Sequence, residues 1–179
     1  MSAFSFGEYI SGRGYKVVNE RVMRGASGIM LLLGLIAFVN GFILENYIVI
    51  PYISGFLAIN FLMGILINPK YSPIRFTAWL LVRKQSPLYI GAVQKRFAWS
   101  LGFTLTMVVF VLSFFLLEDV SYFEPVCMLC LICILFLYLE TAFGICIGCK
   151  IYHLCIKMKI MKTPAEKPNC MGDVCETKA

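Results

Sequence analysis

Cysteine is the residue type in this chain whose number and spacing point most directly to chemistry. The chain has eight cysteines among 179 residues, including a Cys127, Cys130, Cys133 triplet and a Cys146-Ile-Gly-Cys149 pair. A Cys-x-x-Cys pair can cycle between dithiol and disulfide, or carry a persulfide, and so exchange with the thiols of a partner. Cysteine also packs as a small hydrophobe in apolar helices. The sequence therefore predicts a functional pair at Cys146 and Cys149, and for the triplet it leaves a second thiol site and simple packing open.

The same region offers ligands for zinc. Cys146, Cys149 and His153, the only histidine, are three or four residues apart, a spacing that places them on one face of a helix. With one further thiolate they would make a four-coordinate zinc site. The cysteines that follow could supply it: Cys155, Cys170 and Cys175. We predict no cofactor for the chain, with zinc at Cys146, Cys149 and His153 as the alternative.

Four long apolar segments must position these residues. Hydrophobic residues make up 60% of the chain and charged residues only 15%, which is too few charges to cover a soluble domain of this size. A helix needs about 20 apolar residues to cross a bilayer. Such runs occur at residues 25–44, 48–67, 97–117 and 125–149. The sequence therefore predicts an all-α membrane protein with four transmembrane helices, in a transmembrane domain that covers residues 25–155.

The charges between these segments predict the orientation in the membrane. All 16 basic residues lie before the first span, in the link at residues 68–96 or after the fourth span, whereas the two short links are acidic. Basic residues concentrate on the cytoplasmic side of membrane proteins. Both termini and the link at 68–96 are therefore predicted to be cytoplasmic. The net charge of +6 then reflects contact with the lipid bilayer and does not indicate nucleic-acid binding.

The lengths of the links predict how the helices pair. The two short links indicate two antiparallel hairpins, one of helices one and two and one of helices three and four. Residues 1–24 mix aromatic and basic side chains, which is typical of a cytoplasmic segment at the membrane interface. Within the loop at 68–96, the apolar stretch 74–82 predicts a short amphipathic or re-entrant helix. The polar tail at 156–179 is predicted to be flexible.

Glu140 is the only ionisable side chain that the sequence places inside a span. Such a residue is costly in lipid and marks a pathway, a proton relay or an ion pair. Glu140 follows Cys133 by seven residues and shares its helix face, which suits a proton acceptor near a thiol. Lys95 or Arg96 could instead pair with it and hold the second hairpin together. Both roles of Glu140 stay open.

Two effects oppose one another at the cysteine pair. The neighbouring Lys150 favours a thiolate, whereas the C-terminal end of the predicted fourth helix would disfavour it.

Four segments of the chain carry a family resemblance. They are Asn19-Glu20-Arg21-Val22, Tyr71-Ser72-Pro73, the run from Val93 to Trp99, and the run from Gly144 to Tyr152. Together they resemble a bacterial membrane family known as domain of unknown function 4395, over about residues 19–155. The resemblance implies that Cys146 and Cys149 are the characteristic pair, flanked by Gly148 and Tyr152. It also implies a bacterial cytoplasmic (inner) membrane location, and it implies no activity, because that family has none established.

These observations favour a membrane thiol protein. Cys146 and Cys149 would exchange electrons or sulfane sulfur with a cytoplasmic thioredoxin-like or rhodanese-like partner. If the protein is an enzyme, its activity would be thiol–disulfide oxidoreductase-like or sulfur transfer. One alternative is a small transporter or accessory membrane subunit with structural cysteines, in which Glu140, Asn40 and Asn60 line helix interfaces and the chain forms a homo-oligomer. A structural zinc site at the cytoplasmic face is the other.

Overall fold

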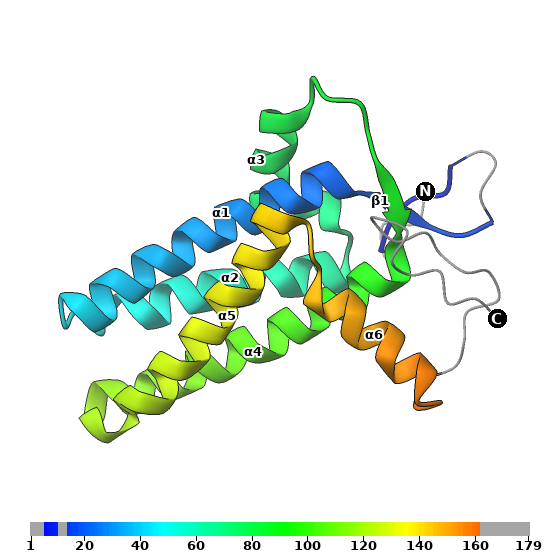
Figure 1. Ribbon diagram of the computed structural model, residues 1–179. Coiled ribbons are helices and arrows are strands. Elements are labelled where there is room, and N and C mark those ends of the chain that lie inside the picture. The colour runs from blue at the N-terminus through cyan, green and yellow to red at the C-terminus, as the bar shows by residue number, and fades with distance from the viewer. Residues whose placement is uncertain (1–5, 11–13, 162–179) are drawn as a thin grey trace.

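The computed structural model describes residues 6–10 and 14–161 and is mostly helical (Figure 1). Its elements follow in chain order: β1 (Val17–Asn19), α1 (Glu20–Phe38), the π-helical turn η1 (Val39–Ile43), α2 (Val49–Leu66), the 3-10 turn η2 (Pro69–Tyr71), α3 (Pro73–Val82), β2 (Tyr89–Gly91), α4 (Ala92–Glu118), the 3-10 turn η3 (Val120–Tyr122), α5 (Phe123–Phe143) and α6 (Ile147–Lys157). The predicted tail at 156–179 lies mainly outside the described residues.

Four helical stretches are long and apolar enough to cross a membrane, as the sequence predicts. They are Glu20–Ile43, Val49–Leu66, Ala92–Glu118 and Val120–Phe143. Large apolar side chains remain exposed along all four, among them Leu32, Ile59, Phe114 and Leu135. An exposed apolar surface of this extent is unfavourable in water and suits contact with lipid. The fold is therefore that of a multi-pass membrane protein.

The helices pack so that the core lies near one end of the bundle. Helix α2 packs against α4, α1 against α5, and α3 lies on α1. Figure 1 shows the α1–α2 and α4–α5 connections at one end of the bundle, and the two strands with α6 at the other. The larger buried cluster includes Met23, Phe61 and Trp99, with Trp99 meeting Phe61 edge-on at 5.4 Å between ring centroids. This cluster supports the end of the bundle that carries α6.

A two-stranded antiparallel sheet precedes α1 and α4, and the all-α prediction misses it. Strand β1 pairs with β2 so that Val17 lies opposite Gly91 and Asn19 opposite Tyr89. Strands of three residues are too short to produce a detectable alternation of apolar and polar residues. The sheet joins the residues that precede α1 to those that precede α4, and Glu20 and Lys95 lie in the first turns of these two helices. Both helices accordingly begin earlier than predicted.

The predicted fourth span, residues 125–149, is wrong at its C-terminal end. Helix α5 ends at Phe143, and Gly144 adopts a left-handed conformation with φ +69°. Glycine reaches this conformation without steric cost, so it commonly ends helices. The chain then begins the separate helix α6 at Ile147. The apolar run continues through the break, which explains why hydropathy alone does not locate it.

The short helix predicted at 74–82 is confirmed as α3 (Pro73–Val82). The Ser72 side chain caps it by accepting a hydrogen bond from the Arg75 N–H at 3.3 Å. The buried Asn60 Oδ1 on α2 accepts hydrogen bonds from the Ser72 hydroxyl at 2.6 Å and from the Ile74 N–H at 3.3 Å. The start of α3 is thereby fixed to α2 through a satisfied buried amide.

Gly64 and Gly34 provide a matched test of this packing. A Cβ atom added at Gly64 would lie 2.0 Å from the Trp99 ring, whereas one at Gly34 would meet Ile134 at an ordinary 3.6 Å. Both substitutions gain similar helix propensity. Gly64→Ala is therefore expected to lower the free energy of unfolding by about 1–3 kcal/mol through overpacking, and Gly34→Ala is expected to be neutral or slightly stabilising. Thermal unfolding in detergent measures both; equal effects would contradict the described packing of α2 on α4.

Candidate functional site

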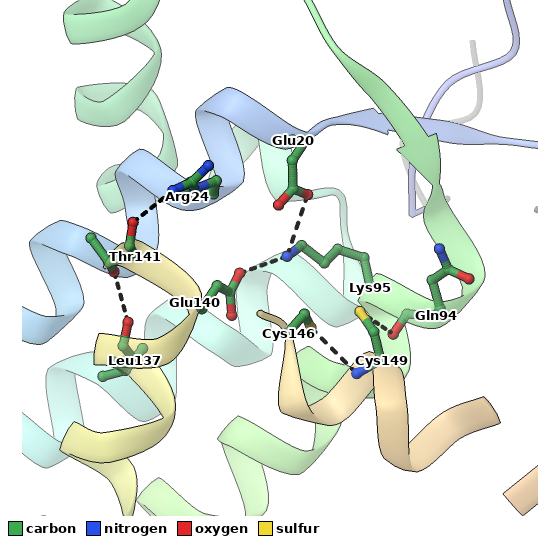
Figure 2. Close-up of polar contacts among 9 residues, drawn as sticks. All are labelled: Glu20, Arg24, Gln94, Lys95, Leu137, Glu140, Thr141, Cys146 and Cys149. Atoms are coloured by element: carbon green, nitrogen blue, oxygen red, sulfur yellow. Dashed lines mark hydrogen bonds and ion pairs between the residues drawn. The ribbon is translucent and has the colours of Figure 1, made fainter. Parts of the chain in front are cut away.

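Cys146 occupies the N-cap position of α6. Its backbone is extended (φ −82°, ψ 100°), and its Sγ accepts a hydrogen bond from the Cys149 N–H at 3.3 Å (Figure 2). An N-cap side chain faces the unpaired N–H groups and positive dipole end of a helix, which favour an anion. A thiol at such a position is activated toward the thiolate. The expectation that a helix C-terminus opposes the thiolate is therefore wrong, because the pair begins a helix and does not end one.

Gly148 brings α6 into direct contact with α4. A Cβ atom added there would lie 2.6 Å from the Ala98 Cβ and 2.7 Å from its Cα, so only glycine allows this approach. One turn later, the buried Tyr152 ring packs against Phe97 at 5.6 Å between centroids. The Cys149 Sγ consequently reaches α4 and lies 3.8 Å from the Gln94 carbonyl oxygen. Both flanking residues implied by the family resemblance thus position the pair.

Lys95 connects three helices beside the pair. Its Nζ lies 2.6 Å from Glu140 Oε1 on α5 and 3.5 Å from Glu20 Oε2 on α1, and the Lys95 and Glu20 side chains are only 1% and 2% exposed (Figure 2). Of the two predicted partners of Glu140, the structure selects Lys95. Glu20 and Lys95 lie in the first turns of α1 and α4, before the apolar runs predicted as spans, and they join Glu140 in one buried cluster. Removing one partner of a buried ion pair typically costs about 3–5 kcal/mol.

Arg24 secures the end of α5 from the neighbouring helix α1. Its Nη2 donates a hydrogen bond to the Thr141 carbonyl at 2.9 Å (Figure 2). The same Nη2 donates a second one to the Ala142 carbonyl at 3.4 Å. Carbonyls in the last turn of a helix have no partner within the helix, so a cation there satisfies both their hydrogen bonding and the helix dipole. Arg24 and Gly144 together fix the point at which the chain leaves α5 for the cysteine pair.

The surroundings set the two thiols apart electrostatically. A hydrogen bond with the Cys149 side chain and the positive charge of Lys95 lower the pKa of Cys146, whereas burial and the Glu140 carboxylate raise it. The same hydrogen bond and burial raise the pKa of Cys149. Both cysteines are half-buried free thiols. The surroundings therefore favour ionisation of Cys146 over ionisation of Cys149.

A cavity of about 120 Å³ extends from the pair into the bundle, and Cys146 and Glu140 contribute to its wall. Cys130 and Cys133 of the predicted triplet line the same cavity from α5. Cys127 lies one turn closer to the N-terminus of that helix and is not among the lining residues. The structure thus brings Cys130 and Cys133 of the triplet and Cys146 of the pair to one internal space. No disulfide links these cysteines in the described part of the chain.

The structure also shows the surroundings of the residues predicted to bind zinc or to line helix interfaces. Cys146, Cys149 and His153 do not form a metal-binding group, and no group of three potential ligands occurs within residues 6–10 and 14–161. Cys170 and Cys175 lie outside the described residues. The pKa of His153 is lowered by burial. Asn40 donates to the Ile36 carbonyl of its own helix at 2.8 Å.

The fold and the site define a multi-pass membrane protein in which a Cys-x-x-Cys pair lies at the start of a short helix, beside a buried ion cluster. The sequence matches the family described as domain of unknown function (DUF4395) over residues 18–157, and the chain belongs to that family. Comparison with curated proteins and with solved structures finds no match.

Sequence reasoning did not identify Glu20, Gln94 and Arg24 as parts of this site. A signal was available, because three of the four segments that carry the family resemblance converge here: they supply Glu20, the Gln94–Lys95 dipeptide and the cysteine pair. Spacing within one segment cannot reveal such a meeting of distant residues. Arg24 carries no comparable signal, since a basic residue before an apolar run is also expected from membrane topology.

Charge substitutions beside Cys146 should shift its titration in opposite directions. Lys95→Met removes a favourable cation and should raise the pKa of Cys146, whereas Glu140→Gln removes an unfavourable anion and should lower it. The measurement is the pH dependence of Cys146 alkylation, followed by mass spectrometry in detergent. Arg96→Met is the matched control, because Arg96 adjoins Lys95 in sequence and is exposed. Shifts of the same sign in both variants would show a general loss of packing and contradict the electrostatic account.

The hydrogen bond between the two cysteines gives a second titration test. Cys149→Ala removes the side-chain donor and should raise the pKa of Cys146, whereas Cys149→Ser keeps a hydroxyl donor and should raise it less. The backbone N–H of residue 149 remains in both variants. Alkylation of Cys146 across the pH range distinguishes them, and identical profiles for Ala and Ser would show that the side-chain hydrogen bond does not stabilise the thiolate.

Proposed function

We propose that the chain is a thiol–disulfide exchange protein of the bacterial cytoplasmic membrane, in which Cys146 is the attacking cysteine and Cys149 the resolving one. The placement of Cys146 Sγ at the N-cap of α6, with the Cys149 N–H at 3.3 Å, carries the proposal. A helix N-terminus favours the thiolate, which is the reactive form in exchange. The opposite pKa shifts of the two thiols support the same division of roles.

The exchange proceeds through one mixed disulfide. The Cys146 thiolate attacks a disulfide sulfur of a soluble partner, the new S–S bond forms, and the partner's second sulfur leaves as a thiolate. After losing its proton, Cys149 attacks Cys146 Sγ, which forms the Cys146–Cys149 disulfide and releases the partner with two reduced thiols. In reverse, a reduced partner attacks Cys146 in that disulfide and Cys149 leaves. Two electrons move in either direction, and the mixed disulfide is shared.

The distribution of charges supports the orientation that this function requires. In the described residues, the basic residues cluster at the end of the bundle that carries the sheet and α6, and Lys150, Lys157 and Lys159 follow the pair in sequence. The links at the other end carry Glu45, Glu118 and Glu124. The positive-inside rule places the basic end in the cytoplasm. Two hairpins, α1 with α2 and α4 with α5, would then cross the bilayer and present the pair to a cytoplasmic thioredoxin-like protein.

Trapping of the mixed disulfide tests the proposed roles. Cys149→Ser removes the resolving thiol, so under mild oxidation with a thioredoxin whose own resolving cysteine is serine, the variant should accumulate a mixed disulfide at Cys146. The junction peptide identifies the bond by mass spectrometry. Cys146→Ser should give little adduct, and Cys155→Ser, which alters a half-buried thiol on the same helix, should behave as the unmodified chain.

Two results would contradict the proposal. The first is a set of adducts distributed equally over Cys127, Cys146 and Cys155, because it would show unselective oxidation of accessible thiols. The second is an inert Cys146 in a protein whose fold is intact by thermal unfolding. A third result would change the proposed reaction. If Cys146 accepts a sulfane sulfur from a rhodanese-like donor and does not react with thioredoxin, the function is sulfur relay at the same residue and not thiol exchange.

A further inference from the structure

Cys146 lines a cavity that lies inside the helical bundle. Its wall is formed by α1, α2, α4 and α5 together with the start of α6, and it is largely apolar, with Phe61, Trp99 and Leu101 among its lining residues. Cys146 and Glu140 lie in the same lining. Helices α1, α2, α4 and α5 all contribute through segments apolar enough to cross a membrane. A ligand in this cavity would therefore be lipid-soluble and would contact the attacking cysteine directly.

The volume limits the ligand to one ring. An engineered apolar cavity of about 150 Å³ stays dry and binds benzene, and this cavity measures about 120 Å³. A six-membered ring with small substituents is thus the largest rigid group that fits without rearrangement. The aromatic Trp99 and Phe61 side chains offer the ring faces and edges to which such a group packs.

A thiol exchange protein that turns over also requires a second redox reaction. The cytoplasm holds thiols reduced, so a cytoplasmic partner delivers electrons to the Cys146–Cys149 disulfide and the resulting dithiol must pass them on. Membrane quinones accept electron pairs from dithiols in this way. We propose, resting on the exchange function above, that the cavity binds the ring of a membrane quinone, which oxidises Cys146 and Cys149.

The reaction balances in two steps. The Cys146 thiolate adds to a ring carbon of the quinone, which forms a C–S bond and moves an electron pair onto a quinone oxygen. Cys149 gives its proton to that oxygen and attacks Cys146 Sγ, so the S–S bond forms, the C–S bond breaks and its electron pair stays on the ring. One proton from water completes the hydroquinone. The sulfur atoms lose two electrons and the quinone gains two electrons and two protons.

Ring binding can be followed through Trp99. The chain has two tryptophans, and Trp79 is exposed on α3, so Trp79→Phe leaves Trp99 as the only indole. Titration of this protein in detergent with a short-chain ubiquinone should quench its fluorescence with saturation. Adding Leu101→Phe, which fills the cavity, should weaken binding about tenfold or more by overpacking. Leu131→Phe is the matched control on the exposed face of α5 and should not change it.

Turnover separates this inference from the proposed function. Anaerobic mixing of the reduced protein with the short-chain ubiquinone should yield one hydroquinone for each Cys146–Cys149 disulfide formed, and Cys146→Ser should yield none. Quenching without saturation, hydroquinone formation by Cys146→Ser, or equal binding by the Leu101→Phe and Leu131→Phe variants would overturn quinone binding. If mixed disulfides with thioredoxin still form at Cys146 in that case, the exchange function stands without the quinone; if they do not, both proposals fail.

Discussion

The buried ammonium group of Lys95 is the constraint on which the rest of the structure depends. A lysine removed from water needs compensating charge, and Lys95 receives it from Glu140 on α5 and Glu20 on α1. Three helices must therefore meet within a few ångströms of one point. The two-stranded sheet supports this meeting by pairing the segments that lead into α1 and α4. The same cation lies close enough to Cys146 to favour its thiolate, so the group that organises the bundle also tunes the thiol.

The break between α5 and α6 is the second feature that determines the surroundings of the cysteine pair. If α5 continued to Cys149, the pair would lie at the carbonyl end of a helix, where the dipole disfavours an anion. Gly144 ends the helix instead, Arg24 binds the freed carbonyls, and the new helix presents its N–H groups to Cys146. Gly148 then allows α6 to contact Ala98 closely. Two glycines with different physical roles thus place the cysteine pair at the start of a helix that packs on α4.

Hydropathy and charge patterns predict most of the fold. The four membrane-crossing helices and α3 follow from runs of apolar residues, because lipid imposes length and composition on each segment separately. The strands, the early start of α4 and the break at Gly144 do not follow, since each depends on contacts between distant segments. The site divides in the same way: Cys146, Cys149 and the Glu140–Lys95 alternative can be read from spacing, whereas Glu20 and the N-cap position of Cys146 require the three-dimensional structure.

The central claim is that Cys146 is the reactive thiolate and lies at the cytoplasmic face. A membrane-impermeant maleimide, applied at neutral pH to inside-out and right-side-out vesicles with each cysteine quantified by mass spectrometry, tests both parts together. The account predicts that Cys146 reacts first among Cys127, Cys146, Cys149 and Cys155, and only in inside-out vesicles. Faster labelling of Cys155 than of Cys146, or labelling of Cys146 from the right-side-out face, would contradict it.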